Sequence, residues 1–312
     1  MGDENNQKLK RNAVLGSVIV SISAILWGFD GVVLTPRLYN LNVSFVVFML
    51  HLIPFVLMNL VFFDEYRKLK KFTRSDFIYF FLIALFGGSL GTIAIVKALF
   101  LVNFEHLSVI VILQKLQPIF AIILAAILLK ERMGKRFILW ASLAIVASYF
   151  LTFGLHMPKA ASDNLLPASL YALLAAFSFG SATVFGKKVL HKFSFRTATF
   201  FRFGMTSFIM FFFVLIGGKI GEFSNITRMN WLIFFIIAFT TGGGAIFLYY
   251  YGLKRIKASV STICELFFPL SAILFDYIFN KHILSPVQWV SAAVLVGAII
   301  RISHINAKNN SK

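Results

Sequence analysis

Long apolar runs, separated by short segments of charged and turn-forming residues, follow one another along almost the whole chain. A helix needs about 20 apolar residues to cross the hydrocarbon core of a bilayer. The pattern predicts an all-α membrane protein with ten transmembrane helices and only short connections. The expected spans are 13–35, 43–63, 77–101, 106–129, 136–156, 167–187, 197–217, 230–252, 258–280 and 286–304.

The composition agrees with a membrane protein and argues against a nucleic-acid-binding protein. Of 312 residues, 59% are hydrophobic and 13% are charged, and the mean hydropathy is +0.85, whereas soluble domains carry about 25% charged residues. A net charge of +18 first suggests nucleic acid. However, the sequence carries no nucleic-acid-binding module, and such binding needs a basic patch on a recognisable fold. We therefore expect the lipid bilayer as the surrounding medium and no nucleic-acid partner.

The positions of Lys and Arg predict the orientation. Cytoplasmic loops carry an excess of these residues. If the N-terminus is cytoplasmic, the inner segments hold 22 of them and the outer segments hold 5. An error in the number of spans would destroy this alternation. We expect a multi-pass protein of the cytoplasmic (inner) membrane with both termini in the cytoplasm.

An internal repeat divides the chain into two halves of five helices. Pro118 and Pro269 lie in similar segments 151 residues apart, and the same offset relates Lys130 to Lys281. Because five is odd, the halves insert with opposite orientation, as in many secondary transporters. The expected divisions are a cytoplasmic tail (1–12), a first repeat (13–156), a linker (157–166), a second repeat (167–304) and a second cytoplasmic tail (305–312).

Several short motifs follow one another in order, and some of them recur in the second half. The first half holds Leu26-Trp27-Gly28, Lys97-Ala98-Leu99, Pro118 and Leu128-Leu129-Lys130-Glu131, and Arg202 follows in the seventh span. The second half echoes the first with Tyr251-Gly252-Leu253, Pro269 and Phe279-Asn280-Lys281. In this the chain resembles the drug/metabolite transporter superfamily, in particular its EamA-type permeases of five plus five helices. The resemblance implies a carrier for metabolites such as amino acids, nucleosides, sugars or amines. The chain departs from the usual pattern at Asp30, His51 and His282, which leaves the substrate open.

Ionisable residues inside predicted spans are the first candidates for function. Each costs roughly 2.5–3.5 kcal/mol at the centre of a membrane helix on insertion scales. The candidates are Asp30, His51, Lys97, Lys115, Arg202, Glu265 and Asp276. Three of them are acids and three are Lys or Arg, with His51 as a possible seventh, and these equal numbers suggest pairing within the bundle. Lys97, Asp30 and Asp276 lie near the outer ends of their helices, so their side chains either serve function or simply reach the interface.

Glu265 and Lys115 are the strongest candidates for substrate binding or ion coupling. Each lies about eight residues, or about 12 Å, from the end of its helix, so neither reaches bulk water unless a cavity comes to it. Burial opposes the charged form of Glu265, whereas a cation such as Lys115 would favour it. Glu265 could then couple protons or bind an amine, or the two residues could form a structural ion pair.

Helix-breaking residues near these positions predict hinges. A proline removes the backbone donor to the carbonyl four residues back, which belongs to Gln114 for Pro118 and to Glu265 for Pro269. Gly88 and Gly242 lie in matching mid-helix segments, where glycine costs about 1 kcal/mol. All four are candidate hinges, with close helix packing as the alternative. Gln114 faces the same side of its helix as Pro118. The aromatic residues that could stack on a substrate are Trp27, Phe179, Phe267, Phe268 and Tyr249 to Tyr251.

The sequence therefore predicts a secondary transporter that moves a small metabolite, such as an amino acid or amine-like compound, by alternating access. The alternative is a membrane-embedded enzyme or biogenesis factor that uses the same bundle. The sequence holds no GxxxxGK[ST] loop for nucleotide hydrolysis and no Cys/His cluster for a metal. We expect no enzymatic activity and no cofactor or metal, and a proton or another ion as a possible coupling partner.

Overall fold

The computed structural model describes residues 2–101, 113–114, 116–155, 165–281 and 283–309, and all its regular elements are helices. In these residues, nine helical segments are long and apolar enough to cross a membrane, and a shorter apolar helix, Gln117–Leu128, accompanies them. That helix is the second part of the predicted span 106–129. The protein is thus the predicted all-α membrane bundle of ten spans in two inverted five-helix repeats.

The first half begins with α1 (Gly2–Phe29), which continues into a π-helical turn, η1 (Asp30–Leu34), and a 3-10 turn, η2 (Thr35–Leu38). Next come α2 (Val43–Phe62) and the loop helix η3 (Phe63–Lys71). The third span consists of α3 (Arg74–Ile83), a π-helical segment η4 (Ala84–Leu90) and α4 (Gly91–Leu101). Within the described residues, this half continues with α6 (Gln117–Leu128) and α7 (Lys135–Phe153).

The second half repeats this order. It begins with α8 (Leu165–Lys192) and α9 (Phe195–Ile216), followed by a short 3-10 helix, η5 (Ile220–Asn225). Its third span is broken into α10 (Arg228–Phe239) and α11 (Gly243–Leu253). Its fourth span is broken into α12 (Ala258–Cys264) and α13 (Phe267–Asn280), and α14 (Pro286–Asn309) ends it.

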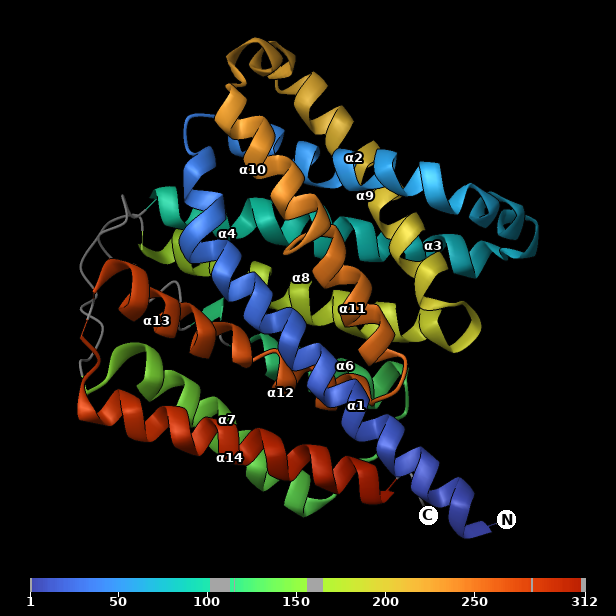
Figure 1. The fold of residues 1–312 in the computed structure, drawn as a ribbon, viewed down its shortest axis with the longest axis vertical. Coiled ribbons are helices and arrows are strands. Elements are labelled where there is room, and N and C mark those ends of the chain that lie inside the picture. Colours follow the sequence, from blue (N-terminus) through green and yellow to red (C-terminus); the bar gives the residue numbers. More distant parts are fainter. Residues whose placement is uncertain (1, 102–112, 115, 156–164, 282, 310–312) are drawn as a thin grey trace.

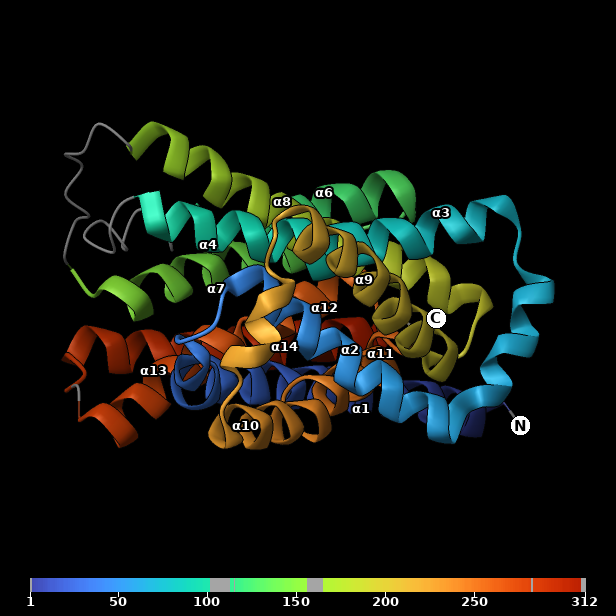
Figure 2. The same ribbon diagram turned by 90° about the horizontal axis from the view of Figure 1, so that it is seen from above.

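The first helix of each half leaves its own repeat and packs on the third and fourth spans of the other. Helix α1 packs on α11, α12 and α13, whereas α8 packs on α3, η4, α4 and α6. We call α1 with α10 to α13 the α1 bundle, and α8 with α3, η4, α4 and α6 the α8 bundle. Seen from above, the α8 bundle lies along one side of the molecule and α1, α10 and α13 along the other (Figure 2). The remaining spans pair as α2 with α9 and α7 with α14 (Figure 1).

Two glycines make these crossings possible. A Cβ atom on Gly28 of α1 would lie 2.0 Å from Ser271 Oγ, just after Pro269. A Cβ atom on Gly180 of α8 would lie 2.9 Å from the carbonyl oxygen of Gln117, just before Pro118. Each first helix therefore crosses the broken fourth span of the other half at a position where a larger residue does not fit.

The repeat is also visible in the backbone. Lys130 and Lys281 have φ angles of 54° and 61°, and among the described residues they are the non-glycine positions with positive φ. They lie 151 residues apart and follow α6 and α13. Because positive φ is uncommon outside glycine, its recurrence at matching positions supports the repeat independently of sequence similarity.

Two sets of loops gather at opposite ends of the bundle. At one end, Lys192 bonds to Asp76 and Lys254 donates to the Phe193 carbonyl, while Lys257 donates to the Arg132 carbonyl. Helix α1 also begins and α14 ends at this end (Figure 1). At the other end, Asn40 and Asn230 exchange hydrogen bonds of 3.0 and 2.9 Å. The lysine- and arginine-rich loops thus share one end of the molecule.

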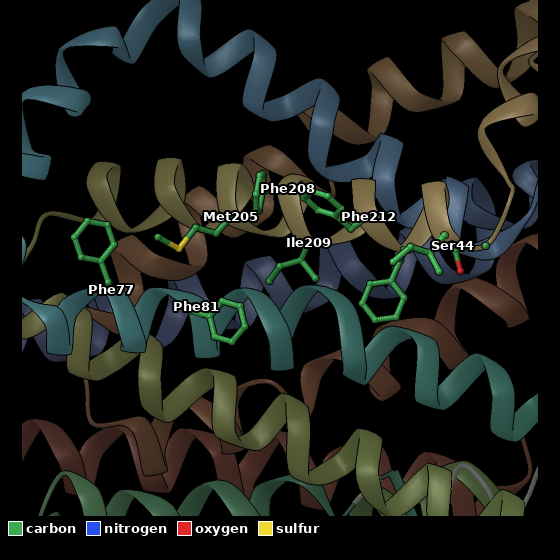
Figure 3. A pocket seen from close by; sticks show the side chains of 10 residues that line it. Ser44, Phe77, Phe81, Met205, Phe208, Ile209 and Phe212 are labelled. Carbon is green, nitrogen blue, oxygen red and sulfur yellow. The ribbon is translucent and has the colours of Figure 1, made fainter.

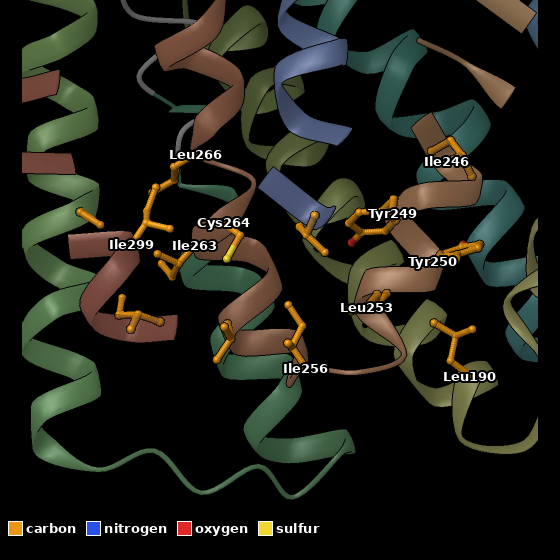
Figure 4. Packing of buried hydrophobic residues seen from close by; sticks show 14 of the residues in the cluster. Leu190, Ile246, Tyr249, Tyr250, Leu253, Ile256, Ile263, Cys264, Leu266 and Ile299 are labelled. Carbon is orange, nitrogen blue, oxygen red and sulfur yellow. The ribbon is translucent and has the colours of Figure 1, made fainter. Parts of the chain in front are cut away.

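The main core lies where α11, α12 and the last helix meet their neighbours. Figure 4 shows Tyr249, Tyr250 and Leu253 of α11 and Ile263 and Cys264 of α12 within this cluster. Cys264, the single cysteine of the sequence, is fully buried there. This packing fixes α11 and α12 on either side of the turn that connects them.

Candidate functional site

Glu265 lies at the break between α12 and α13. The chain ends α12 at Cys264, passes through Glu265 and Leu266, and begins α13 at Phe267. Pro269, the third residue of α13, cannot donate to the Glu265 carbonyl. That carbonyl is not free, contrary to the expectation from sequence, because the Phe268 amide donates to it at 2.9 Å. A tighter turn therefore replaces the lost helical bond.

Four neutral donors surround the Glu265 carboxylate. Tyr249 donates to Oε1 at 2.8 Å, and the hydroxyls of Ser261 and Thr183 donate to the same oxygen at 3.2 and 3.3 Å. The Gln117 amide donates to Oε2 at 2.9 Å. Because hydrogen bonds to an ionised acceptor are stronger than neutral ones, this arrangement suits a carboxylate held at membrane depth.

The cluster joins the two bundles. Glu265, Tyr249 and Ser261 belong to the α1 bundle, whereas Gln117 and Thr183 belong to the α8 bundle. The Thr183 and Tyr249 hydroxyls share a further hydrogen bond of 2.9 Å across the same boundary. Any separation of the bundles at this level must therefore break bonds to Glu265.

An aromatic pair lies beside the carboxylate. The rings of Trp27 and Tyr249 have centroids 5.3 Å apart at an interplanar angle of 53°. Trp27 is partly exposed, and Tyr249 is buried. The Tyr249 hydroxyl thus binds Glu265 while its ring contacts α1, which places an aromatic face next to a polar cluster.

A cavity of about 40 Å³ lies between the two helix breaks. Its polar lining is Gln114, Gln117, Thr262 and Glu265, and its apolar lining includes both Pro118 and Pro269. Pro118 lies in the first turn of α6, directly after a turn at Leu116. The structure thus brings both prolines, Gln114 and Glu265 together around one cavity. Lys115, the predicted cation partner of Glu265, lies outside the described residues.

The two glycine candidates also lie at irregular points of their helices. Gly88 lies in the π-helical segment η4, where a Cβ atom would approach Thr206 Cγ2 to 2.3 Å. Gly242 separates α10 from α11 and has φ −93° and ψ −91°. Both positions combine irregular backbone with close packing, so a hinge role for them remains a prediction.

Asp30 forms a separate site toward the end of α1. Thr35 and Thr241 donate to its two carboxylate oxygens at 3.2 and 3.1 Å. Thr241 directly precedes Gly242, so Asp30 links η1 to the break between α10 and α11. Phe29 contacts Phe275, which places Asp276 at the same end of the α1 bundle as Asp30.

Arg202 and His51 form a third group. Arg202 is 9% exposed and donates to the Tyr250 hydroxyl at 3.2 Å and to the Gly87 carbonyl at 3.3 Å. The His51 ring lies 5.3 Å from the Phe203 ring, and its Nδ1 is 2.8 Å from the Val47 carbonyl oxygen. Arg202 thus connects α9 to the residue next to Gly88, whereas His51 bonds within its own helix.

Sequence reasoning missed Thr183 and Thr262. Both are threonines inside apolar helices, where the hydroxyl commonly bonds its own backbone, so the sequence gives no signal of a role. Their importance follows only from the distance between Thr183 and Glu265 and from the cavity that Thr262 lines.

A much larger groove of about 850 Å³ lies elsewhere, between α3 and α9 (Figure 3). Its lining is almost wholly apolar and includes Phe77, Phe81, Phe208 and Phe212. Apolar side chains of this kind suit contact with lipid, and the groove contains none of the candidate site residues.

Two inverted repeats, broken helices and a polar cluster at their interface define a secondary transporter. The EamA-like transporter family matches residues 14–153 and 166–303, and the chain belongs to this family. It is a multi-pass membrane permease for a small metabolite.

Comparison with individual proteins also indicates a transporter. The chain is 56% identical over 297 residues to the riboflavin transporter ImpX of Fusobacterium nucleatum, covering 95% of this chain and 99% of that protein. It is 24% identical over 285 residues to an uncharacterised transporter of Synechocystis, covering 85% of this chain and 78% of the other. A protein of known crystal structure shares the fold with a TM-score of 0.72 at 14% identity, over 91% of this chain and 96% of that one.

Proposed function

We propose that this protein carries riboflavin across the cell membrane by alternating access. The observation that carries the proposal is the 56% identity, over nearly the full length of both chains, to a protein named as a riboflavin transporter. This replaces the amino acid or amine expected from sequence as the leading substrate. We expect the flavin to cross unchanged, without catalysis.

The Glu265 site is chemically suited to a flavin. Riboflavin joins a flat aromatic ring system, with polar groups along one edge, to a chain of hydroxyls. Trp27 and Tyr249 offer aromatic faces for the ring, and stacked aromatic pairs contribute about 0.5–1.5 kcal/mol beyond the area that they bury. Glu265, Gln117 and Thr183 offer hydrogen-bonding groups for the polar edge.

Binding requires the two bundles to separate. A cavity of about 40 Å³ is far smaller than the roughly 300–1,000 Å³ of typical ligand pockets. Separation would break the bonds from Gln117 and Thr183 to Glu265 and would expose Trp27 and Tyr249. The same bonds would re-form after release, which links substrate binding to the movement of one bundle against the other.

The orientation follows from the loop charges. We propose that the end where Lys192, Lys254 and Lys257 bond to neighbouring loops faces the cytoplasm, together with both termini. The contacts at that end then close the cytoplasmic path to Glu265.

Riboflavin uptake into proteoliposomes containing the purified protein tests the proposal. We expect saturable accumulation of unmodified riboflavin, read by its fluorescence, and competition by other flavins but not by amino acids or amines. Transport of a cationic amine without riboflavin would restore the substrate expected from sequence. A chemically altered flavin with no net movement would favour an enzyme.

A further inference from the structure

The small cavity between the helix breaks has an unusual lining for membrane depth. Glu265, Gln114, Gln117 and Thr262 supply carboxylate, amide and hydroxyl oxygens, which are the ligand atoms preferred by hard cations. Its volume of about 40 Å³ leaves room for an ion or a few waters, because a cavity needs only about 10–15 Å³ of such volume to hold one water. The cavity is too small for any metabolite.

Thr262 provides a second, independent observation. Its side chain is 1% exposed, and its Oγ1 has no hydrogen-bond partner within the described part of the chain. A buried hydroxyl without a partner is costly, and threonine in a helix can usually bond to its own backbone. A ligand in the cavity would supply the missing interaction.

The negative charge of Glu265 indicates that the ligand is a cation. All four donors to its carboxylate are neutral. The four ion pairs found among the described residues involve Asp64, Glu65 and Asp76, so none of them includes Glu265. Burying an unpaired charge is strongly unfavourable, and a cation of charge +1 would balance one carboxylate, whereas a divalent ion would leave a net positive charge.

We propose that this cavity is a binding site for Na⁺, held by Glu265, Thr262 and the amide oxygens of Gln114 and Gln117. Transporters commonly bind coupling ions where membrane helices are broken, and here the breaks of both halves meet at one cavity. Gln117 belongs to the α8 bundle and Glu265 to the α1 bundle. The ion would therefore bind only when the bundles are close together.

Thermal unfolding of the purified full-length protein tests the site without any substrate. Melting would be followed in NaCl and in choline chloride at equal ionic strength. We expect the Tm to rise with Na⁺, by about 3 °C for each tenfold increase above the Kd. Thr262→Val should weaken the apparent Na⁺ affinity about tenfold, and Glu265→Gln should abolish the response. Because riboflavin is absent, a failure here leaves the proposed transport function standing.

Thr206→Val is the matched control. Thr206 is also a buried threonine without a hydroxyl partner among the described residues, but it lies on α9, away from the cavity. It should leave the response to Na⁺ unchanged. Equal Tm values in NaCl and choline chloride would overturn the proposal. The proposal would also fail if Na⁺ raised the Tm of a Lys115→Met variant but not that of the native protein. That result would mean that the ammonium group of Lys115 occupies the cation site in the native protein.

Discussion

Glu265 combines burial, charge and position in a way that no other described residue does. It lies at a helix break and accepts bonds from both bundles, through Gln117 and Thr183 on one side and Tyr249 and Ser261 on the other. Asp30 accepts hydrogen bonds from Thr35 and Thr241. Arg202 of α9 also bonds to both bundles, through Tyr250 and Gly87. Neither Asp30 nor Arg202, however, lines the cavity between the helix breaks. Glu265 is therefore the residue at which a single substitution should affect transport most.

Glu265→Gln should fold and reach the membrane but reduce riboflavin transport at least tenfold. The amide keeps the shape of the side chain and removes the charge, so the surrounding donors lose their ionised acceptor. Initial uptake rates, normalised to protein in the membrane, measure the effect. Glu222→Gln, at the far end of the bundle where Glu222 accepts a bond from the Asn42 amide, is the control.

Lys115→Met added to Glu265→Gln distinguishes function from scaffold. Removing one member of a buried ion pair costs about 3–5 kcal/mol, whereas removing both is often neutral. If Glu265 acts in transport, the double variant stays inactive. Normal transport by the double variant would show that Glu265 and Lys115 are only a structural pair.

At the scale of elements, the breaks in the third and fourth spans determine where the molecule can bend. Pro118 and Pro269 lie in the first turns of α6 and α13, which follow the breaks in the two fourth spans. Gly28 and Gly180 allow the crossing helices α1 and α8 to approach these breaks closely. Sharp kinks at proline have an identifiable cause in the missing backbone donor. The two breaks are therefore the natural places for a change of angle.

Pro118→Ala and Pro269→Ala should slow transport several-fold and leave the Tm unchanged or raised. An alanine at 269 could donate to the Glu265 carbonyl, which now accepts from Phe268, so the helix could continue through the break. Uptake rates and thermal unfolding, measured side by side, separate the two effects. A lower Tm with an unchanged rate per folded molecule would mean that the prolines serve packing alone.

A second element-scale feature is a clamp on the connection between α11 and α12. Glu131, after α6, accepts bonds from the Ala258 and Ser259 amides at 2.7 and 3.1 Å. Lys187 of α8 donates to the Leu253 and Lys254 carbonyls at 2.9 and 3.1 Å. An acid at a helix start and a base at a helix end both complement the helix dipole. The α8 bundle thus holds the α1 bundle by opposite charges at one end.

Glu131→Gln should loosen this clamp and expose the site from that end. Losing a helix cap costs about 0.5–2 kcal/mol, which corresponds to a shift of about 2- to 30-fold in the balance of open and closed forms. In a Cys264→Ala background, a cysteine at Ser261 should react faster with an impermeant thiol reagent in inside-out vesicles. Glu222→Gln should not accelerate the reaction, and an equal rate for both variants would show that Glu131 holds nothing closed.

At the scale of the whole molecule, the loops rich in lysine and arginine lie together. Ion pairs and hydrogen bonds join segments 63–76, 187–197, 130–136 and 254–257 at one end. Asn40, Asn230 and Glu222 lie at the other. Grouping of the positive charge at one end is what the positive-inside rule requires.

Cysteines at Lys70 and Lys135 should be protected from an impermeant thiol reagent in intact cells, and cysteines at Lys219 and Arg228 should react. Each would be placed in a Cys264→Ala background, because Cys264 is the single native cysteine. Permeabilised cells, in which all four positions should react, provide the control. The reverse pattern would place the termini outside.

The number and order of the spans, the inverted repeat and the interest of Glu265, Pro118 and Pro269 could all be predicted from the amino-acid sequence alone. These properties are local: hydrophobic length, proline chemistry and the cost of a buried charge can each be read from neighbouring residues. The matching positions of Lys130 and Lys281 in the two halves were also visible in the sequence, as an offset of 151 residues.

The pairing of the helices could not be predicted from the sequence and is known from the fold. Lipid and protein interiors are equally apolar, so a membrane helix carries little sequence record of the face that packs on its neighbours. The exchange of α1 and α8 between halves, the donation from Thr183 to Glu265 across 82 residues and from Gln117 across 148, and the unpartnered hydroxyl of Thr262 all follow from packing. The site is assembled by contacts between segments distant in sequence, and no local pattern encodes them.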